Sequence, residues 1–362
     1  MKNKMLRTTA LVGSLFVLGT SVSNAQTTIT GQLDLSYRAV SNDAATKKID
    51  NFRGFGKESQ INIANKGKLN NGMDYAAGFS LEFDGNDTAS ATSGISGDLS
   101  GATSGENVYI DLISGNTTIT FGSDHIQNPD SHGHINPAGV GYITSYTAGT
   151  AGIYPTGANS IYGAYGAGIV QTVPGFGKVS VNYVPNPTYG TSNIAGTVGP
   201  EIGNTATVAH YDGTSESAYE VGFVGDFGVK GLSVMAFRTE ETDRADAATG
   251  KTKGHRIGAS YNFGQITVGL DKVETTSNAK VEVDGKAASI TFAATKDFSI
   301  GATYGKADKS DTAVDEKIKL ISLGYSLGPV AVNATIRDVE NIAGVAANGD
   351  SQDAIVRLST KF

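Results

Sequence analysis

Apolar and polar residues alternate with a period of two along almost the whole chain. In the closing stretch, residues 352–362, one set is Ala354, Val356, Leu358, Thr360 and Phe362, and the other is Asp353, Ile355, Arg357, Ser359 and Lys361. Residues 28–39 and 73–83 repeat this pattern. Successive side chains of a β-strand point to opposite faces of the sheet, so the period predicts strands with one apolar and one polar face.

Sixteen such runs are centred near Asp34, Ile61, Phe79, Ile110, Ile119, Tyr165, Val181, Val221, Val234, Ala259, Val268, Ile290, Ala302, Leu323, Ala334 and Val356. Short connections include residues 114–117, 263–265, 295–297 and 328–329, and long ones include 85–106, 123–159, 185–206, 241–254 and 341–351. Every second connection is short. This alternation is typical of an up-and-down antiparallel barrel with tight turns at one rim and loops at the other.

The apolar faces are predicted to point outward into lipid. A soluble sandwich or jelly roll would bury them and would need turns of similar length at both ends. A barrel of sixteen strands is too wide for side chains to fill, whereas a closed barrel satisfies every backbone group in hydrocarbon. A wet interior would then be lined by Asp34, Arg38, Asp74, Glu82, Asp111, Arg256, Asp271, Arg337 and Arg357.

The two ends of the chain are predicted to close the ring. Residues 352–362 would pair with residues 28–40, which leaves no free sheet edge. Phe362 would then face outward at the rim of the short turns, in an aromatic girdle at headgroup level. Further girdle candidates are Tyr37, Phe83, Tyr183, Tyr261, Phe263, Phe298, Tyr304 and Tyr325.

The first 25 residues have the features of a secretory signal peptide. Lys2, Lys4 and Arg7 precede an apolar run over residues 10–18, and the small residues Ser23 and Ala25 flank Asn24 at the expected cleavage site. The mature chain is therefore predicted to comprise residues 26–362. No other stretch has the roughly 18 apolar residues that a membrane-spanning helix needs.

The composition of the chain excludes several classes of function. Without the signal peptide the chain has 25 basic and 35 acidic residues, a net charge of −10, which argues against nucleic-acid binding. It contains no cysteine, so disulfides and thiol chemistry are excluded. The 47 glycines, 15 tyrosines and 14 phenylalanines favour strands and turns.

The mature chain resembles the Gram-negative general porins over almost its whole length. TTITGQLDLSYRA is similar to their first strand, GKLNNGMDYAAGFSLEF to their second turn and third strand, PGFGKVSVNY to the turn into strand seven, and IVRLSTKF to the closing strand. No single piece is a sharp motif. Their order, spacing and terminal Phe together are specific.

The resemblance implies a sixteen-stranded outer-membrane barrel with short periplasmic turns and long extracellular loops. It further implies a homotrimer, passive diffusion of ions and small hydrophilic solutes, and a third loop folded into the lumen. In this family the terminal aromatic strand is also read by the barrel-assembly machinery. No cofactor, no metal and no enzymatic activity are expected.

Residues 123–159 occupy the position of the family's constriction loop. Inside the lumen this loop would present Asp124, His125, Asp130, His132 and His134 near the pore axis. The three histidines could bind a transition metal or switch the pore on protonation. The more ordinary interpretation is a solvated loop, because a flexible His-x-His without a third fixed ligand rarely makes a dedicated metal site.

The opposing wall is predicted to carry a basic patch. By parity Arg38, Arg337 and Arg357 point inward from strands that become neighbours on closure, with Arg256 and Lys178 as weaker candidates. Facing acidic loop residues, they would create a transverse field that sorts solutes by charge and dipole. Because inward carboxylates lie where relatives keep basic residues, weak cation preference is expected rather than strong anion selectivity.

Two further hypotheses concern partners and substrate. Acidic residues predicted in outer loops, among them Glu240, Asp308 and Glu316, could hold divalent cations that bridge lipopolysaccharide, or could simply be solvated. The alternative function is a solute-specific, sugar-binding channel with an aromatic track formed by Tyr109, Tyr142, Tyr146 and Tyr162. An outer-membrane hydrolase is disfavoured, because His255 has no distinctive Ser partner.

Overall fold

The computed structural model describes residues 25–43, 49–82, 104–122, 166–184, 217–242, 253–276, 281–342, 345–346 and 349–362, and these ranges form sixteen β-strands. The strands are β1 (Gln26–Asn42), β2 (Ile49–Lys68), β3 (Asp74–Glu82), β4 (Ser104–Ser114), β5 (Thr117–Gly122), β6 (Gly166–Val173), β7 (Gly177–Val184), β8 (Ser217–Gly225), β9 (Leu232–Thr242), β10 (Lys253–Asn262), β11 (Ile266–Thr276), β12 (Glu282–Ala293), β13 (Phe298–Lys309), β14 (Glu316–Leu327), β15 (Val330–Glu340) and β16 (Ser351–Lys361). Within the described ranges no helix has the length and apolar character to cross a membrane.

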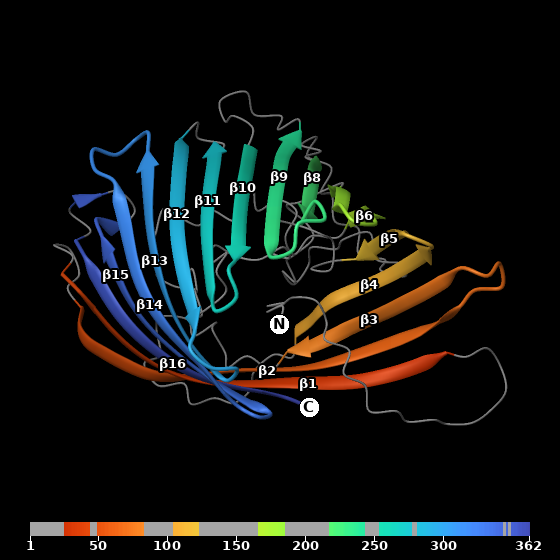
Figure 1. The fold of residues 1–362 in the computed structure, drawn as a ribbon, viewed down its shortest axis with the longest axis horizontal. Coiled ribbons are helices and arrows are strands. Elements are labelled where there is room, and N and C mark those ends of the chain that lie inside the picture. The colour runs from red at the N-terminus through yellow and green to blue at the C-terminus, as the bar shows by residue number, and fades with distance from the viewer. Residues whose placement is uncertain are drawn as a thin grey trace, which may run out of the picture.

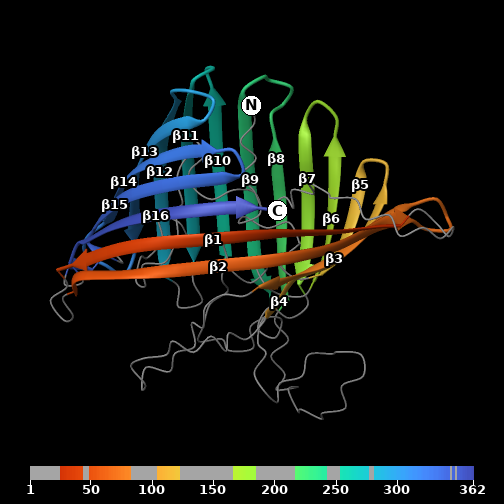
Figure 2. The ribbon, with the colours of Figure 1, turned by 90° about the horizontal axis from the view of Figure 1, so that it is seen from below.

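The strands close into a single antiparallel barrel (Figures 1 and 2). Each strand pairs with its neighbours in the chain, and β16 pairs with β1 from Gln32 opposite Lys361 to Asn42 opposite Ser351. In both views β16 lies beside β1, so the first and last strands share one seam. The predicted fold class and the predicted closure are confirmed.

The sixth predicted run is centred near Tyr165, which lies outside the described residues, and β6 is described from Gly166. Gly122 at the end of β5 stands opposite Gly166. Alternation therefore predicted the presence of this strand.

Two-residue turns join strands at one rim. Ser114 pairs with Thr117 across Gly115 and Asn116, and Leu327 pairs with Val330 across Gly328 and Pro329. Gly115 has φ of 57° and Gly328 has φ of 72°. Such left-handed values suit the twist of a tight hairpin and favour glycine.

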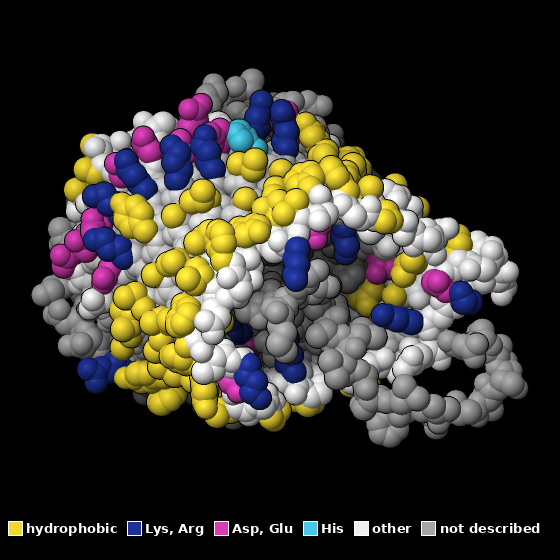
Figure 3. All heavy atoms as spheres, in the orientation of Figure 1, with side chains coloured by type: hydrophobic (Ala, Val, Ile, Leu, Met, Phe, Trp, Pro, Cys, Tyr) yellow, Lys and Arg dark blue, Asp and Glu magenta, His cyan; other side chains and the backbone are white. Residues whose placement is uncertain are grey.

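The apolar faces point outward and the polar faces inward. Ile257, Leu270 and Ile321 are 58%, 67% and 55% exposed, although each is a large apolar residue in the middle of a strand. Their neighbours on the opposite face, such as Arg256 and Asp271, are buried. Figure 3 shows much of the outer surface as a continuous apolar area. This inverted distribution is the one expected of a barrel surrounded by lipid.

Candidate functional site

The inner wall of the barrel carries a charge cluster at the closing seam. Asp353 on β16 lies between two guanidinium groups, Arg337 on β15 and Arg38 on β1. Arg38 Nη2 donates to Asp353 Oδ2 at 2.8 Å, and Arg337 Nε donates to Oδ1 at 3.3 Å while its Nη2 also contacts Oδ2. Arg337 stands directly opposite Asp353 in the register, so the ladder itself positions this pair.

A second ion pair crosses the same seam. Arg357 Nη2 on β16 donates to Asp34 Oδ2 on β1, and Gln32 Nε2 donates to the same oxygen at 2.5 Å. Asp34 is only 3% exposed. Charge-assisted hydrogen bonds of this kind are stronger than neutral ones, so both pairs hold the first and last strands together.

The three arginines lie on the adjacent strands that parity had indicated, but they do not form a bare basic patch. Two carboxylates, Asp353 and Asp34, stand among them and cancel two of the three positive charges. Parity alone had already put both aspartates on the inner face. The pairing becomes visible only with the register of β15, β16 and β1.

A third buried pair lies further along the wall. Arg256 on β10 donates to Asp271 on β11 through Nε at 3.1 and 3.0 Å and through Nη2 at 2.5 Å. Both side chains are almost fully buried, at 2% and 4% exposure. Arg256 is therefore held against the wall and does not extend into the lumen.

The remaining predicted wall residues lie on β3 and β4. Asp74 begins β3 at the short-turn rim and pairs with Lys68 at 2.7 Å. Asp111 on β4 accepts a hydrogen bond from Thr120 at 2.7 Å, and Glu82 is the last residue of β3. Only β2 separates β3 from β1 in the closed order of strands, so these carboxylates lie on strands close to the arginine seam.

Two further carboxylates are buried, of which Glu220 was not predicted from the sequence and Glu316 was predicted in an outer loop. Glu220 on β8 is fully buried and accepts a hydrogen bond from Asn182 on β7 at 2.9 Å. Glu316 begins β14 and is also fully buried. The strict alternation of β8 could have revealed Glu220, because its neighbours Ala218 and Gly222 share its inward parity.

The aromatic candidates lie on the outer face. Tyr37 packs against Phe55 with ring centroids 5.1 Å apart, and Phe298 faces Tyr325 across β13 and β14 at 6.4 Å. Phe362 is 73% exposed at the rim of the short turns. An outward position agrees with the predicted aromatic girdle, which stays a prediction.

Several predicted residues lie outside the described ranges. They are the signal peptide up to residue 24, Phe83, the whole of residues 123–159 with Asp124, His125, Asp130, His132 and His134, and Tyr162. Tyr109, the described member of the proposed aromatic track, is 7% exposed. No group of three or more potential metal-binding side chains occurs in the described part of the chain.

The acidic residues expected in outer loops are partly in strands. Glu240 belongs to β9, Asp308 to β13 and Glu316 to β14. Since the strands extend beyond the apolar stretch, polarity alone does not mark where a strand ends. The prediction of loop positions for these three residues was therefore wrong.

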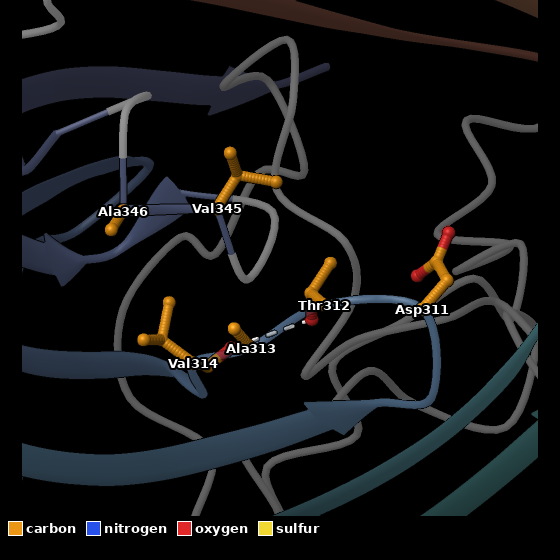
Figure 4. A pocket seen from close by; sticks show the side chains of 6 residues that line it. All are labelled: Asp311, Thr312, Ala313, Val314, Val345 and Ala346. Carbon is orange, nitrogen blue, oxygen red and sulfur yellow. Dashed lines mark hydrogen bonds between the residues drawn. The ribbon is translucent and has the colours of Figure 1, made fainter.

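One small pocket lies between the connections at the loop end of the barrel. Its volume is about 220 Å³, and it is lined by Asp311, Thr312, Ala313, Val314, Val345 and Ala346 (Figure 4). Asp311 is the one charged residue in this lining.

Comparison with known proteins gives consistent results. Residues 8–344 match the family described as Gram-negative porin. Among solved structures, a mutant of the Rhodopseudomonas blastica porin matches with a TM-score of 0.62 at 14% identity, covering 93% of this chain and 100% of that one. The anion-selective porin from Comamonas acidovorans gives a TM-score of 0.62 at 13% identity, again covering 93% and 100%.

A third structure, the outer-membrane expressed OmpT of Vibrio cholerae, matches with a TM-score of 0.60 at 12% identity, covering 95% of this chain and 99% of that one. No curated protein matches the chain. At these identities the structural matches establish the shared fold.

Proposed function

Because the chain belongs to the Gram-negative porin family, we propose that it lets ions and small hydrophilic solutes diffuse through its lumen with a weak preference for cations. It is an outer-membrane porin channel, and both its family and its fold are those of non-enzymatic channels. The proposed preference for cations depends on the charges of the inner wall.

The neutralisation of the arginines carries the proposal. Away from the strand ends, the described inner face has four arginines, Arg38, Arg256, Arg337 and Arg357. The same region has five carboxylates, Asp34, Asp111, Glu220, Asp271 and Asp353, while Asp74, Glu82 and Glu316 stand at strand ends. Lysines of this face lie near the ends of strands, at Lys66, Lys68, Lys178, Lys309 and Lys361. An excess of carboxylates favours cations inside a narrow aqueous path.

Reversal potential across a planar bilayer tests this selectivity directly. With a tenfold KCl gradient, the purified protein is expected to give a potential of the sign that cation preference produces, well below the ideal value for a fully selective pore. A potential of the opposite sign would exclude the proposal. The Comamonas porin, described as anion-selective, is the natural reference channel for the measurement.

Residues 123–159 are proposed to form the constriction. Their 37-residue length and their position after β5 support this assignment, as does the family's use of its third loop. Because the chain contains no cysteine, an introduced cysteine is the only thiol that a reagent can modify. An Asp130→Cys variant should lose conductance when a charged thiol reagent is added, whereas Leu270→Cys, on the outer face, should not. Equal responses would place Asp130 away from the ion path.

The protein is proposed to assemble as a homotrimer through the uncharged part of its outer face. Among described residues, the outward side chains of β16, β1 and β3 to β7 include no charged group, and β2 contributes only Arg53 and Lys57. A contiguous apolar face of this size suits contact with further copies of the chain. Native mass spectrometry should give three chains per particle, and a monomer alone would contradict the proposal.

Export and assembly are proposed to depend on the two ends of the chain. Residues 1–25 would direct secretion and be removed. The exposed ring of Phe362, at the end of β16, would be accessible to the barrel-assembly machinery. Substituting Phe362 by Ala should lower the amount of assembled barrel in the outer membrane without affecting export. An unchanged amount would exclude this role.

A further inference from the structure

A belt of charged side chains runs along the outer face at the loop end of the barrel. It comprises the outward residues Arg238, Glu240, Lys253, His255, Lys272, Glu274, Asp284, Lys286, Lys306, Asp308, Lys317, Lys319, Asp338 and Glu340, all on β9 to β15. Figure 3 shows Lys and Arg side chains alternating with Asp and Glu side chains along the upper and left margins, next to the apolar surface. This belt has no role in the channel, because it faces away from the lumen.

Four lysines of the belt stand in a single row. Lys272 lies opposite Lys286, Lys286 opposite Lys306, and Lys306 opposite Lys317, on the four consecutive strands β11 to β14. Like charges directly opposite one another destabilise a sheet. Such a row is therefore unfavourable unless negative charge is supplied next to it.

Each lysine of the row contacts a carboxylate, but Glu340 is shared with Lys319 and Glu274 is shared with His255. Lys286 contacts Asp284 at 3.0 Å, Lys306 contacts Asp315 at 2.7 Å, Lys317 contacts Glu340 at 3.5 Å, and Lys272 contacts Glu274. Each ammonium group has three N–H donors. The side chains of Lys286 and Lys306 remain 64% and 47% exposed, so both reach the surface.

The row lies at the boundary between the apolar surface and the loop end. One step towards the short turns, the outward residues are Leu270, Ala288 and Tyr304 on β11 to β13 and Lys319 on β14. One step towards the loops, they are Glu274, Asp284 and Asp308. Lysine side chains at such a boundary extend to the headgroup level of the surrounding leaflet.

From this position we propose that the row Lys272, Lys286, Lys306 and Lys317 binds phosphate groups of phosphorylated lipid in the outer leaflet. Neighbouring strands are about 4.8 Å apart, so one phosphate between two strands would accept hydrogen bonds from two ammonium groups. The bound phosphates add negative charge to a row whose carboxylates are partly shared with other cations. The lipid expected here is lipopolysaccharide.

The distribution of charge around the barrel agrees with this site. Outward charged residues are concentrated on β9 to β15 and, among described residues, are missing from β16, β1 and β3 to β7. The charged part of the circumference is therefore the part left in contact with lipid if the uncharged part contacts other subunits. The inference rests on the outer-membrane location and does not depend on the proposed ion selectivity.

Binding of lipopolysaccharide to the purified protein in detergent micelles provides the test. The double variant Lys286→Gln, Lys306→Gln should bind about 30-fold more weakly, since each lysine near an anionic surface contributes about a fivefold gain. The control variant Lys230→Gln, Lys296→Gln removes two exposed lysines at the opposite rim and should bind normally. Replacement of Lys286 and Lys306 by Arg should preserve binding.

The unaltered protein gives a second, independent measurement. Lipopolysaccharide from which the phosphates have been removed should bind at least tenfold more weakly, and millimolar inorganic phosphate without lipid should not protect the protein from thermal unfolding. Equal affinity of the Gln variant and the control, or equal affinity for both lipid forms, would overturn the assignment. Conductance of the Gln variant should remain unchanged, which separates this result from any failure of the channel function.

Discussion

The phenyl ring of Phe362 lies over Gly31. A Cβ added at Gly31 would come within 2.2 Å of Phe362 Cζ, and the backbones of the two residues exchange hydrogen bonds of 2.7 and 3.0 Å. Gly31 is buried on the outer face, where most of its neighbours are exposed, because the terminal ring covers it. The last residue of the chain therefore seals the seam at the short-turn rim.

Replacing Gly31 by Ala should destabilise the barrel by about 1–3 kcal/mol, the usual range for adding a group to a filled space. The ring would have to move away from the seam. Urea unfolding in lipid vesicles would measure the loss. The double variant with Phe362→Ala should show little further cost from Gly31→Ala, since the clash has gone. Additive costs would show that the ring and Gly31 act independently.

Replacing Asp353 by Asn should shift ion selectivity towards anions. The substitution removes the carboxylate that lies between Arg38 and Arg337, so two guanidinium charges face the lumen with less compensation. Reversal potential in a KCl gradient measures the shift. Asp338→Asn is the matched control, because Asp338 lies on β15 but points outward. An identical potential in both variants would mean that the seam arginines do not face the ion path.

The fold could be predicted from the sequence because one physical constraint acts at every strand. Lipid outside and water inside force opposite polarity on the two faces, and the period-two pattern of β10 or β16 records this directly. The pairing of β16 with β1 followed from the need to leave no edge in hydrocarbon. These inferences need no knowledge of which residues stand opposite one another.

The ion pairs of the inner wall could be predicted only in part, because they depend on which residues of neighbouring strands stand opposite one another. Parity put Arg337 and Asp353 on the inner face, but their pairing requires that position 337 stand opposite position 353. The lysine row was missed for the same reason, since Lys272 and Lys286 are 14 positions apart and meet only through the hairpin of β11 and β12. Charged residues on the outer face also contradict the simple prediction that charge is confined to the lumen.

Substitutions at Gly115 should change the stability of the barrel only through the backbone conformation of the turn. Gly115 has φ of 57° and a Cβ there would meet nothing within 4 Å, so only the left-handed conformation is at stake. Ala should cost about 1–2 kcal/mol, and Asn, which tolerates this region better, should cost less. Urea midpoints of the two variants provide the comparison. Equal midpoints would indicate that the turn changes type to accommodate either residue.

The buried pair of Arg256 and Asp271 should show strong coupling. Asp271→Asn alone leaves the guanidinium group without the carboxylate that now accepts three hydrogen bonds, and should cost about 3–5 kcal/mol. The double variant Arg256→Gln, Asp271→Asn places two neutral amides at the same positions and should cost less than the sum of the single changes. Urea unfolding of the four proteins in vesicles gives the coupling energy. A coupling energy near zero would show that the lumen solvates both groups, in which case the pair would contribute little to the stability of the wall.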